Sequence, residues 1–158
     1  MRFGHPERRP GTRSLRQGRF SGQNQIYHIN TATIDRNPIF QTLALGRQVV
    51  RAMRREDEGY HSRTLAFVVM PDHLHWLLQL VGNRPLSGVV NTMKSFSSRR
   101  INAVLGESGS VWQKGYYDHA MRREEDLKAV ARYIIANPVR AGLVGSVRQY
   151  SLWDAEWV

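Results

Sequence analysis

Alternating and continuous apolar positions predict four β-strands. In residues 25–33, β-branched and aromatic residues alternate with polar ones, which is the period of a half-buried strand. Residues 64–70 and 73–81 are nearly continuous apolar runs separated only by Pro71-Asp72, so they predict an antiparallel hairpin. Residues 111–121 are rich in aromatic side chains and predict the fourth strand.

Three other segments repeat their apolar residues every three to four positions and predict helices. The first begins at Asn37-Pro38, with Asn as N-cap and Pro as the first helical residue, and runs to about 58. The second spans 87–105 and ends at Gly106, and the third follows the acidic residues 124–126 and stops near Asn137-Pro138. The predicted buried stripes are Ile39, Leu43, Gly46, Val50 and Met53 in the first helix, Val90, Met93, Ser97, Ile101 and Val104 in the second, and Leu127, Val130 and Ile134 in the third.

The resulting order of elements, β-α-β-β-α-β-α, is that of a split βαβ arrangement. It predicts an α+β protein with a ferredoxin-like, four-stranded antiparallel sheet and one additional C-terminal helix. We expect a single domain over residues 25–158. Residues 1–24 are rich in Arg, Gly, Ser and Gln and predict a flexible basic arm, which either contacts DNA phosphates or keeps the protein in solution.

Charge and composition narrow the class of partner. The 158 residues contain 23 Lys and Arg against 13 Asp and Glu, a formal charge of +10, which favours a polyanion such as nucleic acid. The absence of cysteine excludes disulfides and thiolate metal ligands. No apolar run is long enough to span a bilayer and the start lacks the apolar core of a signal peptide, so we expect a cytoplasmic, nucleoid-associated protein with no membrane or small-molecule cofactor partner.

Two histidines and one helix supply the candidate chemistry. Side chains alternate along a strand, so His73 and His75 face the same side, roughly 6–7 Å apart, and can share one metal ion. Tyr133 and Asn137 are four residues apart on the third helix and share a face beside its apolar stripe. If that helix packs on the histidine face, two imidazoles, an amide oxygen and a phenol converge. Two nitrogen ligands and one oxygen, with positions left for phosphate and water, suit Mg²⁺ or Mn²⁺.

This convergence predicts a metal-dependent reaction at a phosphodiester. The cation would orient the phosphate and stabilise its developing charge, and the phenol of Tyr133 would be the nucleophile. Each residue also has a structural interpretation: a histidine pair that is only hydrogen-bonded, a core tyrosine, and an asparagine that merely ends its helix. Two other functions stay open, namely a module that binds hairpin DNA without cutting it and a metal hydrolase that uses water.

Three motifs resemble a known family. The segment Met70-Pro71-Asp72-His73-Leu74-His75 resembles the histidine–hydrophobic–histidine motif of the HUH single-tyrosine transposases. Residues 133–144 resemble the nucleophile helix of one branch, the REP-associated tyrosine transposases, and residues 112–119 are similar to the segment that precedes it there. The resemblance covers residues 25–150, nearly the whole predicted domain.

The resemblance implies an enzyme that binds single-stranded DNA folded into an imperfect hairpin. Such enzymes cleave beside the hairpin through a 5′-phosphotyrosine, using Mg²⁺ or Mn²⁺. At the matching positions Tyr133 would be the nucleophile and His73 and His75 metal ligands, while Asn137 stands where mobile relatives carry a glutamine ligand. The resemblance also implies a monomer, although a dimer is possible because some relatives exchange the tyrosine helix between subunits.

Basic and aromatic residues outside this set are predicted to contact the DNA. Basic side chains would meet phosphates, and aromatic rings would stack on unpaired bases unless they belong to the core. The predicted residues are Lys94, Arg99, Arg100, Trp112, Lys114, Tyr116 and Tyr117. The sequence offers no evident partner for His28.

Overall fold

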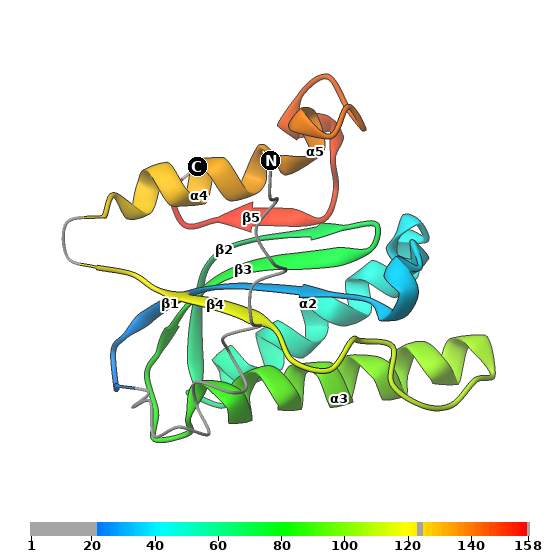
Figure 1. Ribbon diagram of the computed structural model, residues 1–158, viewed down its shortest axis with the longest axis horizontal. Coiled ribbons are helices and arrows are strands. Elements are labelled where there is room, and N and C mark those ends of the chain that lie inside the picture. The colour runs from blue at the N-terminus through cyan, green and yellow to red at the C-terminus, as the bar shows by residue number, and fades with distance from the viewer. Residues whose placement is uncertain (1–21, 123–124, 158) are drawn as a thin grey trace, which may run out of the picture.

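A computed structural model describes residues 22–122 and 125–157. The chain forms one five-stranded sheet with helices on both faces (Figure 1). In chain order the elements are β1 Ile26–Ala32, the 3₁₀ turns η1 Ile34–Arg36 and η2 Ile39–Gln41, α2 Leu43–Glu58, β2 Ser62–Met70, β3 His73–Leu80, α3 Leu86–Leu105, β4 Tyr117–Ala120, α4 Leu127–Ile135, α5 Asn137–Arg140, η3 Val147–Gln149 and β5 Trp153–Ala155.

The sheet has the order β4-β1-β3-β2-β5, and every neighbouring pair is antiparallel. The order of its first four strands is that of a ferredoxin-like split βαβ sheet, so the predicted fold class is confirmed. The predicted strand count of four is wrong by one. The segment 153–155, for which no strand was predicted, pairs with β2 and covers what would be a free sheet edge.

Two hydrophobic cores lie on opposite faces of the sheet. Helices α2 and α3 cover one face, and α4 covers the other (Figure 1). Because side chains alternate along each strand, β3 sends Leu74, Trp76 and Leu78 into the larger core and Leu77 into the core under α4. The face under α4 also carries His73 and His75, and this arrangement positions the candidate site.

The boundaries of the first helix differ from the prediction. Asn37-Pro38 does not start α2, because the chain makes two 3₁₀ turns there and α2 begins at Leu43. Two predicted stripe residues are also exposed: Leu43 by 37% at the start of α2, and Val104 by 62% near the end of α3. In α2 the buried stripe is shifted and includes Leu45 and Val49. As predicted, α3 ends at Gly106, which adopts the left-handed conformation that glycine permits.

Other predictions for the chain ends and connections are only partly tested. Residues 111–116 precede the short strand β4 and form only an isolated bridge, between Thr33 and Trp112, and single hydrogen bonds to β1, so the predicted strand 111–121 is too long. Most of the predicted basic arm lies outside the described residues. Its last residues, 22–24, form a turn in which the Asn24 amide donates to the Leu80 carbonyl, so the folded body includes them.

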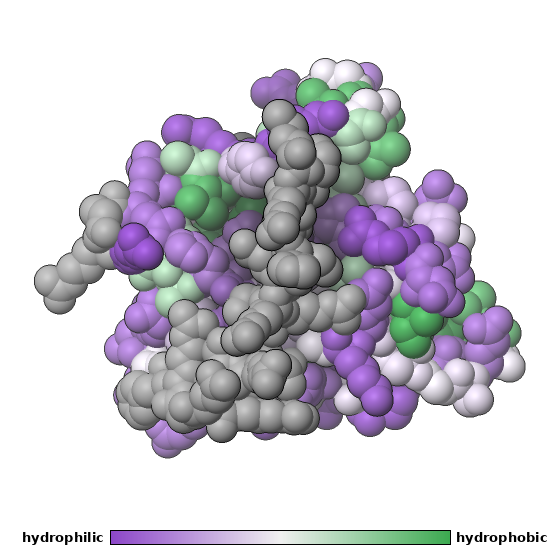
Figure 2. All heavy atoms as spheres, in the orientation of Figure 1, coloured by the Kyte–Doolittle hydropathy of each residue, from purple (hydrophilic) through white to green (hydrophobic). Residues whose placement is uncertain are grey.

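The outer surface fits the strongly basic composition. Figure 2 shows hydrophilic residues around several hydrophobic patches, one of which lies over α5 and the loop that follows it. Val139 of α5 and Leu143 of that loop are exposed. Among the helices of the described part of the chain, none combines the length and the apolar character needed to cross a bilayer.

Candidate active site

His73 and His75 lie side by side on one face of β3. Their ring centroids are 5.0 Å apart, and the rings meet edge to face. His75 is 8% exposed, and His73 is half-buried. The prediction that both imidazoles share one face of the sheet is therefore confirmed.

A carboxylate and a guanidinium hold His73 in place. The Nδ1 atom of His73 lies 2.7 Å from Oδ1 of Asp72, and Oδ2 of Asp72 lies 2.9 Å from Nε of Arg36. Partial burial raises the pKa of Asp72, but the bonds to His73 and Arg36 and the charges of both outweigh it, so the pKa is lowered overall. An ionised carboxylate only accepts hydrogen bonds, so Nδ1 of His73 carries the proton and Nε2 keeps its lone pair for a ligand.

His75 is oriented by a histidine that sequence reasoning missed. Nε2 of His28, on β1, lies 3.0 Å from Nδ1 of His75. The two residues are diagonal neighbours, because Asn30 pairs with His75 and His28 pairs with Leu77. Alternation along β1 places His28 and Asn30 on one face, but only the pairing register brings His28 to His75. The Nε2 atom of His75 faces away from this bond.

Burial keeps both of these imidazoles neutral. It lowers the pKa of His28 to about 4, with a smaller contribution from the charge of His119. The pKa of His75 is lowered to about 3, and burial is again the largest cause. The charges of His28, His73, Arg140 and Arg36 lower it further. A neutral imidazole is the form that ligates a metal.

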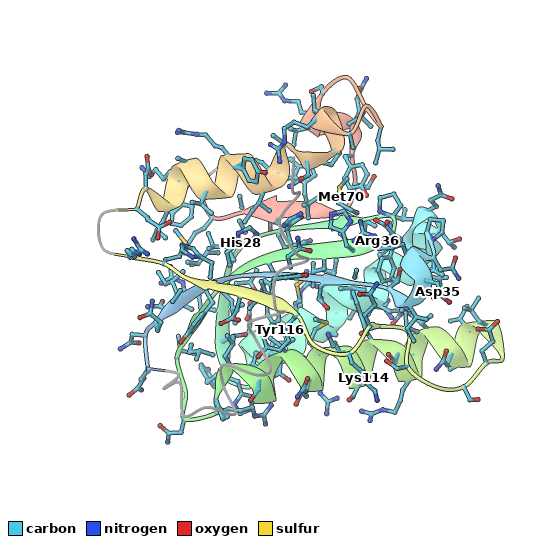
Figure 3. The ribbon with its side chains drawn as sticks, in the orientation of Figure 1. His28, Asp35, Arg36, Met70, Lys114 and Tyr116 are labelled. Carbon is cyan, nitrogen blue, oxygen red and sulfur yellow. The ribbon has the colours of Figure 1, made fainter. Side chains whose placement is uncertain are left out.

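Helix α4 packs on the histidine face, as the site requires. Its first turn is capped by Asp126, whose side chain accepts hydrogen bonds from two backbone amides. Ile134 and Ile135 are buried in the same core as Leu77 and Val68, which pairs with His75. Helix α4 therefore lies over the sheet face on which β3 carries the histidine pair and β1 carries His28. Figure 3 shows His28 between the sheet and α4.

Tyr133 is the solvent-facing aromatic residue of α4. Its side chain is 57% exposed, so the alternative of a core tyrosine is excluded. The guanidinium carbon of Arg140, from the short helix α5, lies 3.9 Å from the centre of the Tyr133 ring. The same guanidinium is close enough to help lower the pKa of His75. Arg140 thus contacts the tyrosine ring and acts electrostatically on His75.

Asn137 caps the end of α4 through its amide nitrogen. Nδ2 donates to the Ile134 carbonyl at 2.8 Å and, more weakly, to the Tyr133 carbonyl at 3.4 Å. With Nδ2 in these bonds, Oδ1 is the atom available to a cation. Asn137 therefore does end its helix, and this role leaves its oxygen free to act as well.

The donor set fits a divalent cation. His73 and His75 each use Nδ1 for a protein hydrogen bond, which leaves both Nε2 atoms for a metal in the arrangement typical of metal-bound histidines. Within residues 22–122 and 125–157, no three His, Cys, Asp or Glu side chains are grouped closely enough to hold a metal. A third protein ligand would therefore be an amide oxygen, for which Asn137 is the candidate, and substrate oxygens would complete the shell.

Three of the predicted DNA contacts are wrong because the side chains are buried. Trp112 is 1% exposed and its indole nitrogen donates to Ser97, so its ring has no free face for a base. Tyr116 is 3% exposed, and burial raises the pKa of its phenol. Lys94 is 8% exposed and donates to the carbonyls of Gln113 and Gly115, where it holds the loop before β4.

The other four predicted residues remain at the surface. Arg99, Arg100, Lys114 and Tyr117 are exposed, with Tyr117 at 44%. Nε of Arg100 donates to the Gln48 side chain at 3.0 Å, which ties this arginine to α2. A hollow of about 560 Å³ between α3 and the loop before β4 has Arg99 and Lys114 at its rim. These cations suit phosphates, but this hollow is not part of the histidine site.

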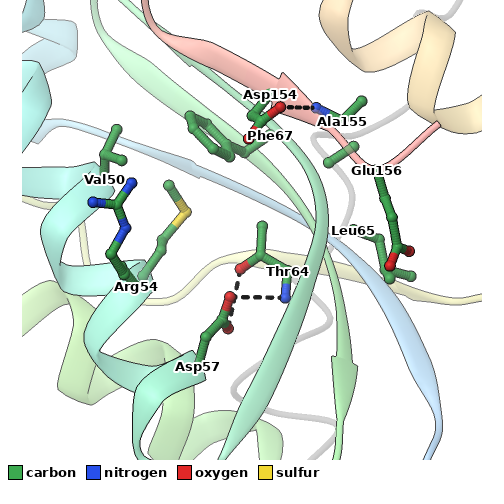
Figure 4. A pocket seen from close by; sticks show the side chains of 11 residues that line it. Val50, Arg54, Asp57, Thr64, Leu65, Phe67, Asp154, Ala155 and Glu156 are labelled. Carbon is green, nitrogen blue, oxygen red and sulfur yellow. Dashed lines mark hydrogen bonds between the residues drawn. The ribbon is translucent and has the colours of Figure 1, made fainter. Parts of the chain in front are cut away.

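A second hollow, of about 290 Å³, is structural. It lies between α2, β2 and β5, and Figure 4 shows it from close by. The Asp57 carboxylate at its edge accepts hydrogen bonds from the backbone amide and the hydroxyl of Thr64 and from the hydroxyl of Ser62. Because these bonds already occupy the carboxylate, we assign it the role of joining α2 to β2.

A comparison with protein families shows which family the chain belongs to. The model of IS200-like transposases matches residues 21–137, well over half of the chain, and the matched range includes His28, both β3 histidines, Tyr133 and Asn137. The chain belongs to the IS200-like transposase family. The resemblance to single-tyrosine transposases in its motifs is thereby confirmed at the level of the family.

The individual relatives of this chain are consistent with the family assignment. A candidate REP-associated tyrosine transposase of Haemophilus influenzae is 28% identical over 109 residues, which are 63% of this chain and 62% of that protein. An uncharacterised protein of the same organism is 30% identical over 94 residues, 46% of this chain and 52% of that protein. The chain thus spans between half and two thirds of the length of these curated relatives.

Solved structures show the same fold. A REP-associated tyrosine transposase bound to a REP hairpin superposes with a TM-score of 0.69 at 21% identity, over 85% of this chain and 79% of that one. A candidate transposase of Deinococcus radiodurans superposes with a TM-score of 0.53 at 20% identity, over 75% of this chain and 94% of that one.

Proposed function

We propose that this chain is a metal-dependent, single-strand DNA endonuclease and strand transferase of the REP-associated type. Its substrate would be hairpin-forming single-stranded DNA, and it would act through a 5′-phosphotyrosine with Tyr133 as the nucleophile. The observation that carries the proposal is the exposed Tyr133 side chain on the helix that packs over the His73 and His75 face. The Arg140 guanidinium stacks on the Tyr133 ring and its charge helps to lower the pKa of His75, which supports one continuous site.

The chemistry is a transesterification without water. Oη of Tyr133 attacks the phosphorus, the new O–P bond forms, and the bond from phosphorus to the 3′ oxygen breaks. The phenol proton goes to solvent, and the departing 3′ oxygen takes up a proton to become a hydroxyl. The phosphotyrosine keeps the reactivity of a phosphodiester, so a 3′ hydroxyl can attack it in the reverse sense and transfer the strand without ATP.

His73, His75 and Asn137 would hold Mg²⁺ or Mn²⁺. When bound, the cation supplies positive charge to the scissile phosphate. The chain's own residues do the rest: Asp72 and His28 fix the orientation of the two imidazoles, and Arg140 holds the face of the tyrosine ring and has N–H groups for a phosphate oxygen.

Hairpin DNA is proposed as the partner for two reasons. The chain carries a formal charge of +10, which favours a nucleic acid. The solved relative with the same fold is bound to a REP hairpin. A monomer suffices for the proposed site, because β3, α4 and α5 of one chain supply His73, His75, Tyr133 and Asn137.

The decisive test is covalent capture. A palindromic oligonucleotide from the gene's own genomic neighbourhood is labelled at its 3′ end, because the tyrosine attaches to the 5′ phosphate of the 3′ fragment. With Mn²⁺, we expect wild type to give a slow band on a denaturing gel and Tyr133→Phe to give none while still retarding the hairpin on a native gel. Tyr60→Phe is the matched control, because Tyr60 is an 81% exposed tyrosine on the turn between α2 and β2.

Each other outcome rejects the proposal in a specific way. An adduct from Tyr133→Phe at the wild-type level excludes this nucleophile. Cleavage without any adduct indicates a hydrolase that uses water, and binding without cleavage indicates a hairpin-binding module. A parallel calorimetric titration with Mn²⁺ tests the cation site, since replacing His73 and His75 with Ala should abolish the binding signal and the cleavage together.

A further inference from the structure

A row of three side chains crosses the sheet beside the histidine pair. Asn30 pairs directly with His75 on one side and with Tyr117 on the other, so the three side chains point to the same face. Tyr117 therefore lies two strand spacings, roughly 9–10 Å, from His75. Unlike the buried Tyr116, Tyr117 is 44% exposed, so its ring is accessible at the sheet edge.

Arg36 reaches the same part of the sheet from a turn with a strained backbone conformation. Asp35 and Arg36 have φ angles of 55° and 54°, a left-handed conformation that is unusual for two successive residues other than glycine. The turn brings Nε of Arg36 to Oδ2 of Asp72, whose other oxygen binds His73. The Arg36 side chain is still 55% exposed, so it stays accessible to a ligand although its Nε is bound to Asp72.

A hollow joins these groups. Its volume is about 250 Å³, and its lining includes Asn30, Ala32, Arg36, Gly115 and Tyr117. Two lining residues, Asn30 and Ala32, are the direct strand partners of His75 and His73. The hollow thus lies next to the strand positions that pair with the two histidines, and it offers an aromatic ring, an amide and a guanidinium.

These groups match the parts of one nucleotide. An aromatic ring stacks on any base, a guanidinium forks onto phosphate oxygens, and an amide bonds to a base edge. We propose that the hollow between Tyr117 and Arg36 binds the unpaired nucleotide next to the scissile phosphate, with Tyr117 stacked on its base and Arg36 on its phosphate. This site rests on the proposed function for the position of the scissile phosphate, while its binding of single-stranded DNA can be measured without cleavage.

The test compares two DNA probes by fluorescence anisotropy in the Tyr133→Phe background with Mn²⁺. One probe is the genomic hairpin with a six-nucleotide single-stranded flank across the cleavage position, and the other is the same hairpin without a flank. We expect Tyr117→Ala to weaken binding of the flanked probe by between about 5-fold and 150-fold and to leave the unflanked probe unchanged. Tyr117→Phe keeps the stacking face and should bind both probes like the parent.

The role of Arg36 is tested by the salt dependence of binding, because Arg36 is proposed to contact a phosphate. Arg36→Gln should reduce the slope of log affinity against log salt concentration by about 0.7 for the flanked probe, the contribution of one single-strand phosphate contact. Arg36→Lys should retain that slope. Arg47→Gln is the charge-matched control, since Arg47 is exposed on α2 on the other side of the sheet, and it should leave the preference for the flanked probe unchanged.

The outcomes separate this site from the chemistry. The inference is overturned if Tyr117→Ala binds the flanked probe like the parent, or if it weakens both probes equally. If wild type forms no covalent adduct but Tyr117→Ala still loses affinity for the flank alone, cleavage through Tyr133 is rejected and the nucleotide site stands. Circular dichroism melting of Tyr117→Ala and Tyr117→Phe verifies that both variants are folded.

Discussion

The guanidinium of Arg140 lies 3.9 Å from the centre of the Tyr133 ring, and the two residues belong to consecutive helices, α4 and α5. The break between these helices falls at Ala136, and Pro138 in the first turn of α5 has no N–H with which to continue the backbone bonds of α4. The short helix that follows the break carries the cation that stacks on the tyrosine.

Replacing Arg140 should slow adduct formation more than it affects the fold. Arg140→Leu removes the stacked cation, whose interaction with an exposed ring is worth about 0.5–1 kcal/mol and up to about 2 kcal/mol in a desolvated site. We expect adduct formation to be slowed by a factor of between about 2 and 30, and Arg140→Lys to lie between this variant and wild type. Single-turnover gel assays give the rates, and an unchanged rate for Arg140→Leu would remove Arg140 from the site.

Replacing His28 should weaken metal binding although His28 is not a proposed ligand. Its bond to Nδ1 of His75 leaves Nε2 of His75 for the cation, and loss of such a supporting bond typically lowers metal affinity about 10- to 100-fold. We expect this loss in a calorimetric Mn²⁺ titration of His28→Ala, with partial recovery in His28→Gln. His61→Ala, a histidine outside the site, is the control, and equal affinities for His28→Ala and wild type would contradict the positioning role.

Stability should fall when the pH is lowered below 6.5 in the absence of metal. The folded pKa values of His28 and His75 are lowered to about 4 and about 3, so between pH 6.5 and 4 the unfolded chain binds more protons than the folded one. The free energy of unfolding therefore rises with pH across this window. Acidification from pH 6.5 to 4 lowers it by an amount on the order of a few kcal/mol.

Urea denaturation in EDTA at several pH values between 7 and 4 measures this effect. Other charges near the pair, namely His73, His119, Arg36 and Arg140, add to the cost of protonation, and the lowered pKa of Asp72 contributes a loss only at more acidic pH. His28→Gln should flatten the dependence. A midpoint that stays constant from pH 6.5 to 4 would show that the two imidazoles are not held neutral by the fold.

Trp112 should behave as a core residue rather than as a stacking platform. It is 1% exposed, packs against Phe40 and donates to Ser97, so Trp112→Ala should reduce the free energy of unfolding by about 3–5 kcal/mol. Trp112→Phe keeps most of the volume and should bind the hairpin like wild type. A large loss of hairpin affinity in a stably folded Trp112→Phe would contradict this and support a role of Trp112 in DNA binding.

Local patterns were sufficient for the β2–β3 hairpin, for the presence of the three longer helices and for part of the site. The two-residue link at Pro71-Asp72 forces β2 and β3 into a hairpin, and the period of two in β3 forces His73 and His75 onto one face. The apolar stripe of α4 predicts which side of that helix is buried and places Tyr133 beside it, but only the structure shows that Tyr133 is exposed rather than in the core. These features depend on neighbours within a few residues, which the sequence lists directly.

Sequence patterns failed where contacts join distant parts of the chain. The third strand could be predicted to within one residue, but the pairing of β5 with β2 could not, because a three-residue strand has almost no pattern of its own. The burial of Trp112 and Lys94 depends on how α3 packs against the loop before β4. An aromatic or basic residue has the same appearance in a sequence whether it faces solvent or that interface.

The sequence by itself determined the split βαβ order, the shared face of His73 and His75, and the helical spacing of Tyr133 and Asn137, because each follows from the fixed geometry of a strand, a tight turn or a helix. Only the tertiary structure decided that His28 supports His75, that Arg36 and Asp72 hold His73, and that Arg140 lies on Tyr133. Those contacts depend on strand register and on the angle at which the chain leaves α4, and both are set by the packing of the whole domain rather than by any local segment.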